Sequence, residues 1–147
     1  MQYDVKIKKL RDNAVVPTYG SEFAAGADLY AAVDEAVTIE PSETKLIPTG
    51  LALAIPVGFA GLIYARSGLA SKRGLAPANK VGVIDADYRG EVMVALHNHG
   101  KEAQTIEAGE RIAQMVIAPF VTANFILSDE LDNTERGEGG FGSTGRK

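Results

Sequence analysis

Polar and hydrophobic residues alternate with a period of two in two stretches of the chain. In the first, Tyr3, Val5 and Ile7 alternate with charged residues, and residues 92–97 form the second. This pattern indicates β-strands with one buried face. Shorter apolar runs predict further strands at residues 37–39, 46–47, 51–55, 59–65, 111–118 and 121–127.

Prolines and glycines separate these runs at short intervals, so each predicted strand is short. The spacing is typical of a sandwich or barrel and not of alternating strands and helices. We therefore expect an all-β fold. The separating residues are Pro41, Pro48, Pro56, Pro77, Pro119, Gly50, Gly58 and Gly90.

Two segments depart from the β pattern. Residues 67–74 begin with Ser67, which suits a helix N-cap, and end with Gly74, so they predict one short helix. Apolar residues thin out after residue 127, and residues 136–145 hold five glycines in ten positions. We therefore expect a β domain at residues 1–127 and a flexible glycine-rich arm at residues 128–147.

The composition fits one globular domain, because 147 residues with 46% hydrophobic and 23% charged residues can form one packed core. A net charge of -4 argues against a grip on a nucleic-acid backbone. No window approaches the roughly 18 apolar residues of a membrane span, and the first residues lack the apolar stretch of a signal peptide. We expect a cytoplasmic protein without nucleic-acid or membrane partners.

The chain has no cysteine and two histidines. Disulfides, thiolate zinc sites and cysteine nucleophiles are therefore excluded. His97 and His99 flank Asn98, and a pair at this spacing can bind a metal. Because the sequence offers no third ligand nearby, we expect both to be surface histidines.

Residues 82–91 carry the most unusual set of polar side chains, which we interpret as a hairpin between two apolar strands. Asp85 directly follows an apolar pair, so its carboxylate can orient and deprotonate a water at the edge of a core. Asp87 is expected to be a structural turn acid. Turn chemistry alone is the alternative interpretation for both.

A possible phosphate site lies where residues 59–65 meet the predicted helix. Arg66 supplies a planar charged fork, Ser67 a hydroxyl, and Gly68 room for a close backbone approach. Helix capping by Ser67 accounts for one of these features without a ligand. Together the three residues predict a phosphate cradle.

The glycine-rich arm lacks the lysine ending and following helix of a P-loop. A floppy polar tail is the simplest interpretation, but Phe141 gains nothing in solvent unless it stacks on a partner such as a nucleobase. Arg136, Ser143 and Thr144 would then meet a terminal phosphate. Elsewhere, Asp28 lies among apolar residues, as either a buried hydrogen-bonded acid or a carboxylate facing metal-bound water.

Five segments of the chain, in this order, closely resemble the five motifs of the trimeric dUTPase family. The resemblance implies a jelly-roll-like β fold and a homotrimer, with each active site built from three subunits and closed by a neighbour's arm. Ala65 departs from the family pattern, in which many members carry proline. The five segments are residues 25–31, 65–70, 82–91, 111–114 and 136–145.

The same resemblance implies hydrolysis of dUTP to dUMP and pyrophosphate, which limits uracil entry into DNA and supplies dUMP for thymidylate synthesis. Asp85 would activate the water that attacks the α-phosphorus. The cofactor would be Mg²⁺, held mainly by the triphosphate, with Asp28 binding metal-bound water.

The resemblance also implies the substrate contacts. Arg66, Ser67 and Gly68 would line the phosphates, and Gln114, otherwise a plain surface amide, would contact the phosphate or its ordered water. Tyr88 would lie against the deoxyribose and reject UTP. The uracil edge would be read by Asn79, Gly82, Val83, Ile84 and Met93. The arm would supply Arg136, Phe141, Gly142, Ser143 and Thr144, with Phe141 stacked on uracil.

Two alternatives stay open. A dCTP deaminase would share the fold, but that family carries a catalytic glutamate in a strand that here reads Val-Met-Val-Ala-Leu from Val92. A nucleotide-gated interaction module would use closure of the arm over dUTP to change binding to a protein partner. The water-activating carboxylate of Asp85 favours catalysis over a pure sensor.

Overall fold

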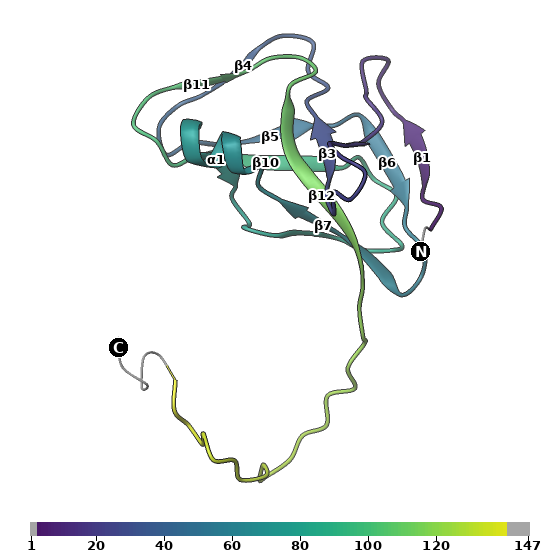
Figure 1. The fold of residues 1–147 in the computed structure, drawn as a ribbon, viewed down its shortest axis with the longest axis vertical. Coiled ribbons are helices and arrows are strands. Elements are labelled where there is room, and N and C mark those ends of the chain that lie inside the picture. Colours follow the sequence, from purple (N-terminus) through teal and green to yellow (C-terminus); the bar gives the residue numbers. More distant parts are fainter. Residues whose placement is uncertain (1–2, 141–147) are drawn as a thin grey trace.

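The computed structural model describes residues 3–140, which form an all-β fold with one short helix. Figure 1 shows its elements. The strands are β1 (Lys6–Lys9), β2 (Thr18–Tyr19), β3 (Ala27–Tyr30), β4 (Val37–Ile39), β5 (Thr44–Pro48), β6 (Leu51–Ala54), β7 (Phe59–Tyr64), β8 (Leu75–Pro77), β9 (Gly82–Ile84), β10 (Met93–Asn98), β11 (Gln104–Ile106) and β12 (Arg111–Pro119), and the helix is α1 (Ser67–Arg73).

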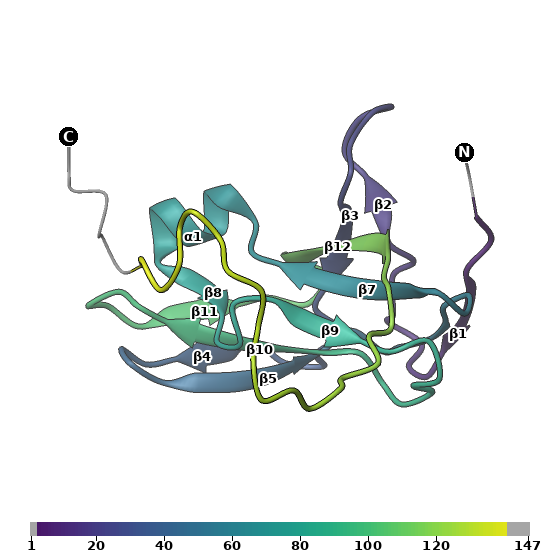
Figure 2. The same cartoon turned by 90° about the horizontal axis from the view of Figure 1, so that it is seen from below.

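The strands pair antiparallel in four sheets. The largest has the order β2-β3-β12-β7-β9, and a second has the order β5-β10-β8. Two ribbons, β1-β6 and β4-β11, complete the described part of the chain. Figure 2 shows β7 and β12 in one layer above β10 and β5, which gives the jelly-roll-like arrangement expected.

The core lies between these layers. It follows the alternation at residues 92–97, whereas the buried face predicted for the first strand is wrong, because every residue of β1 is exposed. In β10, Val94 and Leu96 are fully buried, whereas Met93, Ala95 and His97 are half-buried on the other face. Each large aliphatic side chain buried in this way contributes about 1.5–3 kcal/mol to stability. The largest fully buried apolar side chains are Leu29, Ile39, Ile47, Leu51, Leu75, Val92, Val94, Leu96, Ile106 and Ile112.

The helix forms where the sequence predicts it and ends at Gly74, whose left-handed φ of 66° suits glycine. The N-cap prediction is wrong. Arg66, in an extended conformation, occupies the N-cap position without a side-chain capping bond, and Ser67 is the first helical residue. This places Arg66 at the junction between β7 and α1, with its side chain free to reach across the sheet.

Two strand predictions are also wrong. Residues 82–91 do not form a hairpin, because β9 pairs with β7 while β10 pairs with β5 and β8. The segment after β9 instead passes from one sheet to another. Residues 121–127 form no strand, because no partner strand in the chain lies beside them.

After β12 the chain leaves the β domain and extends away from it (Figure 1). Large apolar side chains in this segment are exposed, including Val121, Phe125 and Leu127 at 94%, 95% and 99%. Further on, Arg136 donates a hydrogen bond to the Gly139 carbonyl at 2.8 Å. The predicted substrate contacts of Phe141, Gly142, Ser143 and Thr144 lie outside the described residues. Among residues 3–140, no helix has the length and apolar character needed to cross a membrane.

Candidate functional site

A narrow cleft of about 60 Å³ lies between β9 and β10. β9 and β10 belong to different sheets, so no backbone ladder pairs them with each other. The space left between them is the cleft. Its lining residues are Ile63, Pro77, Asn79, Gly82, Val83, Ile84, Met93, Val94 and Ala95. All five residues predicted to read a uracil edge are therefore brought together in one cleft.

Asp85 follows β9 directly and is exposed at the start of a braced turn. The Tyr88 N–H donates to the Asp85 carbonyl at 3.2 Å, and the Arg89 guanidinium donates to the Ala86 carbonyl at 2.6 Å. The Tyr88 hydroxyl donates to the Glu91 carbonyl at 2.9 Å, so the ring folds back over Gly90. A Cβ on Gly90 would lie 2.4 Å from that hydroxyl, which only glycine avoids. These bonds hold Asp85 and Tyr88 on one short loop.

Glu91 anchors the end of this loop to the body of the domain. Its carboxylate accepts hydrogen bonds from the Arg11 Nε and the Gly50 N–H, both at 2.9 Å. The hydrogen bond and charge of Glu91 raise the pKa of Arg11. Gly50 has a φ of 69°, so its N–H meets Glu91 in a conformation that suits glycine. The position of Asp85 is thus set from both ends of its segment.

A second group of polar side chains surrounds Asp28, which is 8% exposed. Its Oδ1 accepts a hydrogen bond from the Arg66 Nε at 2.8 Å, and its Oδ2 lies 3.3 Å from a terminal nitrogen of Arg111. Asp28 is therefore a buried acid that is paired with two arginines. Because Arg66 is held through Nε, its two terminal nitrogens stay available for an anion.

Arg111 was not among the predicted site residues. A regular strand would place Arg111 and Gln114, three positions apart, on opposite faces. A bulge between Arg111 and Ala113 shifts the register, so Arg111 reaches Asp28 while Gln114 pairs opposite Asp28. The odd spacing of two polar residues in an apolar strand is the only sequence signal for this bulge.

Gln114 links this group to the start of the helix. Its Nε2 donates to the Ala65 carbonyl at 2.9 Å, directly before Arg66. The opposite side of the amide lies over Gly26, where a Cβ would come within 2.4 Å of the Gln114 Oε1. Arg66, Ser67 and Gln114 therefore sit at one end of β7, as a phosphate cradle requires.

The cleft loop and this cradle lie at different ends of β7. Gly61 pairs with Ile84, so Asp85 lies opposite the start of β7, whereas Gln114 pairs with Tyr64 at its end. The separation along the strand is about four residues, or about 13 Å at about 3.3 Å per residue. Within one chain, β7 therefore keeps the Asp85 loop apart from the group around Arg66.

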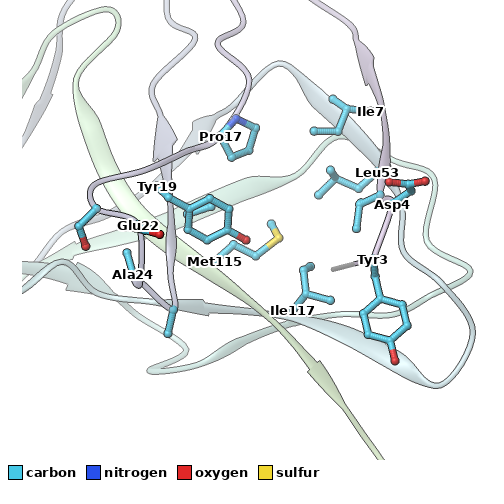
Figure 3. A pocket seen from close by; sticks show the side chains of 14 residues that line it. Tyr3, Asp4, Ile7, Pro17, Tyr19, Glu22, Ala24, Leu53, Met115 and Ile117 are labelled. Atoms are coloured by element: carbon cyan, nitrogen blue, oxygen red, sulfur yellow. The ribbon is translucent and has the colours of Figure 1, made fainter. Parts of the chain in front are cut away.

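A larger groove of about 840 Å³ lies on the other face of β3 and β12. Ala27 and Met115 face it, one position along from Asp28 and Gln114. Figure 3 shows Tyr19, Met115, Ile117 and Leu53 around this groove, with β1 along one side. Its lining is about equally polar and apolar and carries none of the predicted site residues.

The described residues hold no cluster of three or more acidic, histidine or cysteine side chains that could cage a metal. His99 is exposed, as expected of a surface histidine, and His97 is half-buried. Desolvation lowers the pKa of His99, and the charges of His97 and Lys80 lower it further.

The fold is shared with solved dUTPase structures. The dUTPase of Staphylococcus bacteriophage 80alpha, in a substituted form with dUpNHpp, aligns with a TM-score of 0.88 and 32% identity over 98% of this chain and 99% of that chain. A dUTPase from phage phi11 of S. aureus, described with a structural Mg(II) ion, aligns with a TM-score of 0.78 and 28% identity over 87% of this chain and 98% of that chain.

Sequence comparison agrees with the fold. The dUTPase family model matches residues 12–145. A deoxyuridine 5'-triphosphate nucleotidohydrolase of Desulfitobacterium hafniense is 53% identical over 144 residues, covering 96% of this chain and 95% of the relative. One of Nautilia profundicola is 54% identical over 142 residues, covering 97% and 99%. The chain belongs to the dUTPase family.

Proposed function

We propose that the protein hydrolyses dUTP to dUMP and pyrophosphate. The observation that carries this proposal is the cleft between β9 and β10, together with Asp85, which directly follows β9. A base in the cleft would place its α-phosphate beside this carboxylate. Asp85 takes a proton from a water, the water oxygen bonds to the α-phosphorus, and the bond to the bridging oxygen breaks as pyrophosphate leaves. This reaction limits uracil entry into DNA and supplies dUMP for thymidylate synthesis.

The cleft between β9 and β10, with Tyr88, is the nucleoside half of the proposed site and selects a deoxyuridine. Strand backbone around Gly82 and Ile84, with the Asn79 amide, offers donors and acceptors to a pyrimidine edge inside a rigid cleft. Tyr88, held over Gly90, packs against the deoxyribose and leaves no room for a 2′-hydroxyl. This contact supports discrimination against UTP.

The cradle around Arg66 is the phosphate half of the proposed site and neutralises the charge of the triphosphate. Arg66 directs its terminal nitrogens at the phosphates while Asp28 holds its Nε, and Ser67, Gly68 and Gln114 complete the cradle. Mg²⁺ bound to the triphosphate offsets its charge. The donor set fits an ion held mainly by substrate, because the Asp28 oxygens already accept from two arginines and keep lone pairs only for a metal-bound water.

The two halves come together between chains. Because β7 separates the Asp85 loop from the Arg66 cradle within one chain, a complete site requires the loop of one subunit beside the cradle of another. The arm, residues 128–147, reaches from a third subunit and closes the site. Phe141 stacks on uracil, while Arg136, Ser143 and Thr144 bind the γ-phosphate beside Gly142.

The homotrimer is supported by two surfaces that one chain leaves exposed. The segment after β12 displays Val121, Phe125 and Leu127 to solvent, and a chain of this size gains nothing by exposing them alone. The groove beside β1 is open, and Leu53, Met115 and Ile117 give it an apolar part. We assign the segment of one copy to the groove of the next. Such head-to-tail contacts form a ring when the rotation closes, here after three subunits.

Introducing charged residues into the exposed segment after β12 tests this assembly. Replacing both Phe125 and Leu127 with aspartate is expected to shift the mass in solution from trimer to monomer, because two charges would have to pack against the apolar side chains of the groove and near its acids, Asp4 and Glu22. Light scattering measures the mass. The matched control is Val57→Asp, at a position 94% exposed outside both surfaces. A double variant that stays trimeric would contradict the assignment.

The activity itself is tested by substrate choice. Incubation with dUTP, UTP, dCTP and dTTP plus Mg²⁺ is expected to give dUMP and pyrophosphate from dUTP, with UTP left intact. Chromatography identifies the products. Release of ammonia from dCTP would instead establish a deaminase.

A further inference from the structure

We propose that His97 and His99 of each chain form a two-imidazole site for one divalent transition metal, Cu²⁺, Ni²⁺ or Zn²⁺. The two residues lie at the end of β10, two positions apart, where side chains of a strand point to the same face. The site is separate from the residues proposed to bind dUTP, so it does not rest on the proposed function.

The ring geometry fits one shared ion. The ring centroids are 4.4 Å apart, and the ring planes meet at 64°. A metal about 2.0–2.1 Å from an imidazole nitrogen lies roughly 3.2 Å from the ring centre, so two imidazoles that bind one ion with an angle of about 90° at the metal have centres roughly 4.5 Å apart. The observed ring spacing matches that value.

A hydrogen bond orients the first imidazole. The His97 Nδ1 lies 2.8 Å from the Thr44 Oγ1 on the neighbouring strand β5. When Nδ1 carries the proton and donates to this hydroxyl, the lone pair is on Nε2, which then faces outward as a ligand. Histidine ligands in metal sites commonly have such a partner on the other ring nitrogen.

The backbone between the two histidines is held rigidly. Asn98 is fully buried, and its side chain bonds the Ile39 and Glu102 carbonyls at 2.9 and 2.8 Å. The His99 N–H donates to the Gly74 carbonyl at 2.9 Å, at the end of α1. The pair therefore loses little conformational entropy on binding an ion.

The ligand set selects the kind of ion. Imidazole suits Cu²⁺, Ni²⁺ and Zn²⁺, whereas Mg²⁺ and Ca²⁺ prefer oxygen. With two protein ligands, water fills the other positions. Lys80 is a cation close enough to lower the pKa of His99, and its charge would repel a metal. Removal of that charge should strengthen binding.

The chain allows a sharp experiment, because it contains two histidines and no cysteine in total. Isothermal titration of the full-length, untagged protein with Cu²⁺ is expected to show one ion per chain, unaffected by excess Mg²⁺. The electron paramagnetic resonance spectrum of that ion should show nitrogen ligands. Binding to the folded state should also raise the midpoint of thermal unfolding.

Three variants distinguish metal binding at the His97–His99 pair from metal binding elsewhere on the protein. His99→Gln is expected to weaken Cu²⁺ binding at least tenfold, since one ligand remains, and Thr44→Val to weaken it about 10-fold through the lost orienting bond. Lys80→Asn, which suits the φ of 64° at that position, should strengthen binding. Unchanged affinity in His99→Gln, or one ion per three chains, would overturn the proposal. The unfolding midpoint in chelator confirms that each variant is folded.

Discussion

Asn at position 85 is expected to lower kcat for dUTP hydrolysis by about 10²–10⁴-fold, the usual contribution of a general base. The amide has nearly the shape of the carboxylate but cannot accept the proton of the attacking water. Asp85 is exposed, and its carbonyl already bonds the Tyr88 N–H, so the turn should survive the change. Steady-state kinetics measure kcat, and titration with a non-hydrolysable dUTP analogue measures affinity, which should stay near the wild-type value.

The matched control is Asp87→Asn, which changes an exposed acid two residues further along the same turn. We expect its kcat to stay near the wild-type value, since Asp87 is assigned to the turn and not to the water. Near-normal turnover by Asp85→Asn would remove the assigned role. If Asp85→Asn bound dUTP normally and the wild-type protein did not hydrolyse dUTP, the alternative of a nucleotide-gated interaction module would be favoured.

Deletion of residues 136–147 is expected to lower kcat by on the order of 100-fold or more, because the γ-phosphate loses its charged partner and water enters the site. The β domain should stay folded. Its last strand, β12, ends at Pro119, and residues 136–140 are not part of the hydrophobic core cluster. Turnover of dUTP, the thermal midpoint and the mass in solution together separate loss of closure from loss of structure.

A point variant makes the test of the arm sharper. Phe141→Ala keeps the backbone and charges but removes the ring proposed to stack on uracil, so its effect should fall between wild type and the deletion. Such stacking contributes about 1–3 kcal/mol per base. Full activity in the truncated protein would exclude the arm from the active site.

Several elements could be predicted from local signals alone. The alternation at residues 92–97 marks β10 and its buried face, and Gly74 marks the end of α1, because each depends on neighbouring residues in the chain. The five motif segments also located the residues of the cleft and the cradle. Their order along the chain carried that information, and no contact between them was needed.

The pairing of strands could not be predicted in the same way. An alternating pattern indicates which face of a strand is buried but not which strand lies beside it, so β9 and β10 were wrongly joined in a hairpin. Residues 121–127 have the composition of a strand and find no partner within their own chain. Their apolar side chains become buried only against another surface.

The sequence by itself therefore determined the all-β class and the position of the one helix, and it predicts the residues of the proposed nucleotide site. Only the tertiary structure decided how those residues meet. Asp28 reaches Arg66 and Arg111 across 38 and 83 positions of chain, through a bulge that hydrophobic alternation does not encode. Such contacts depend on which strands share a sheet, and this follows from the packing of the whole core and not from any local run of residues.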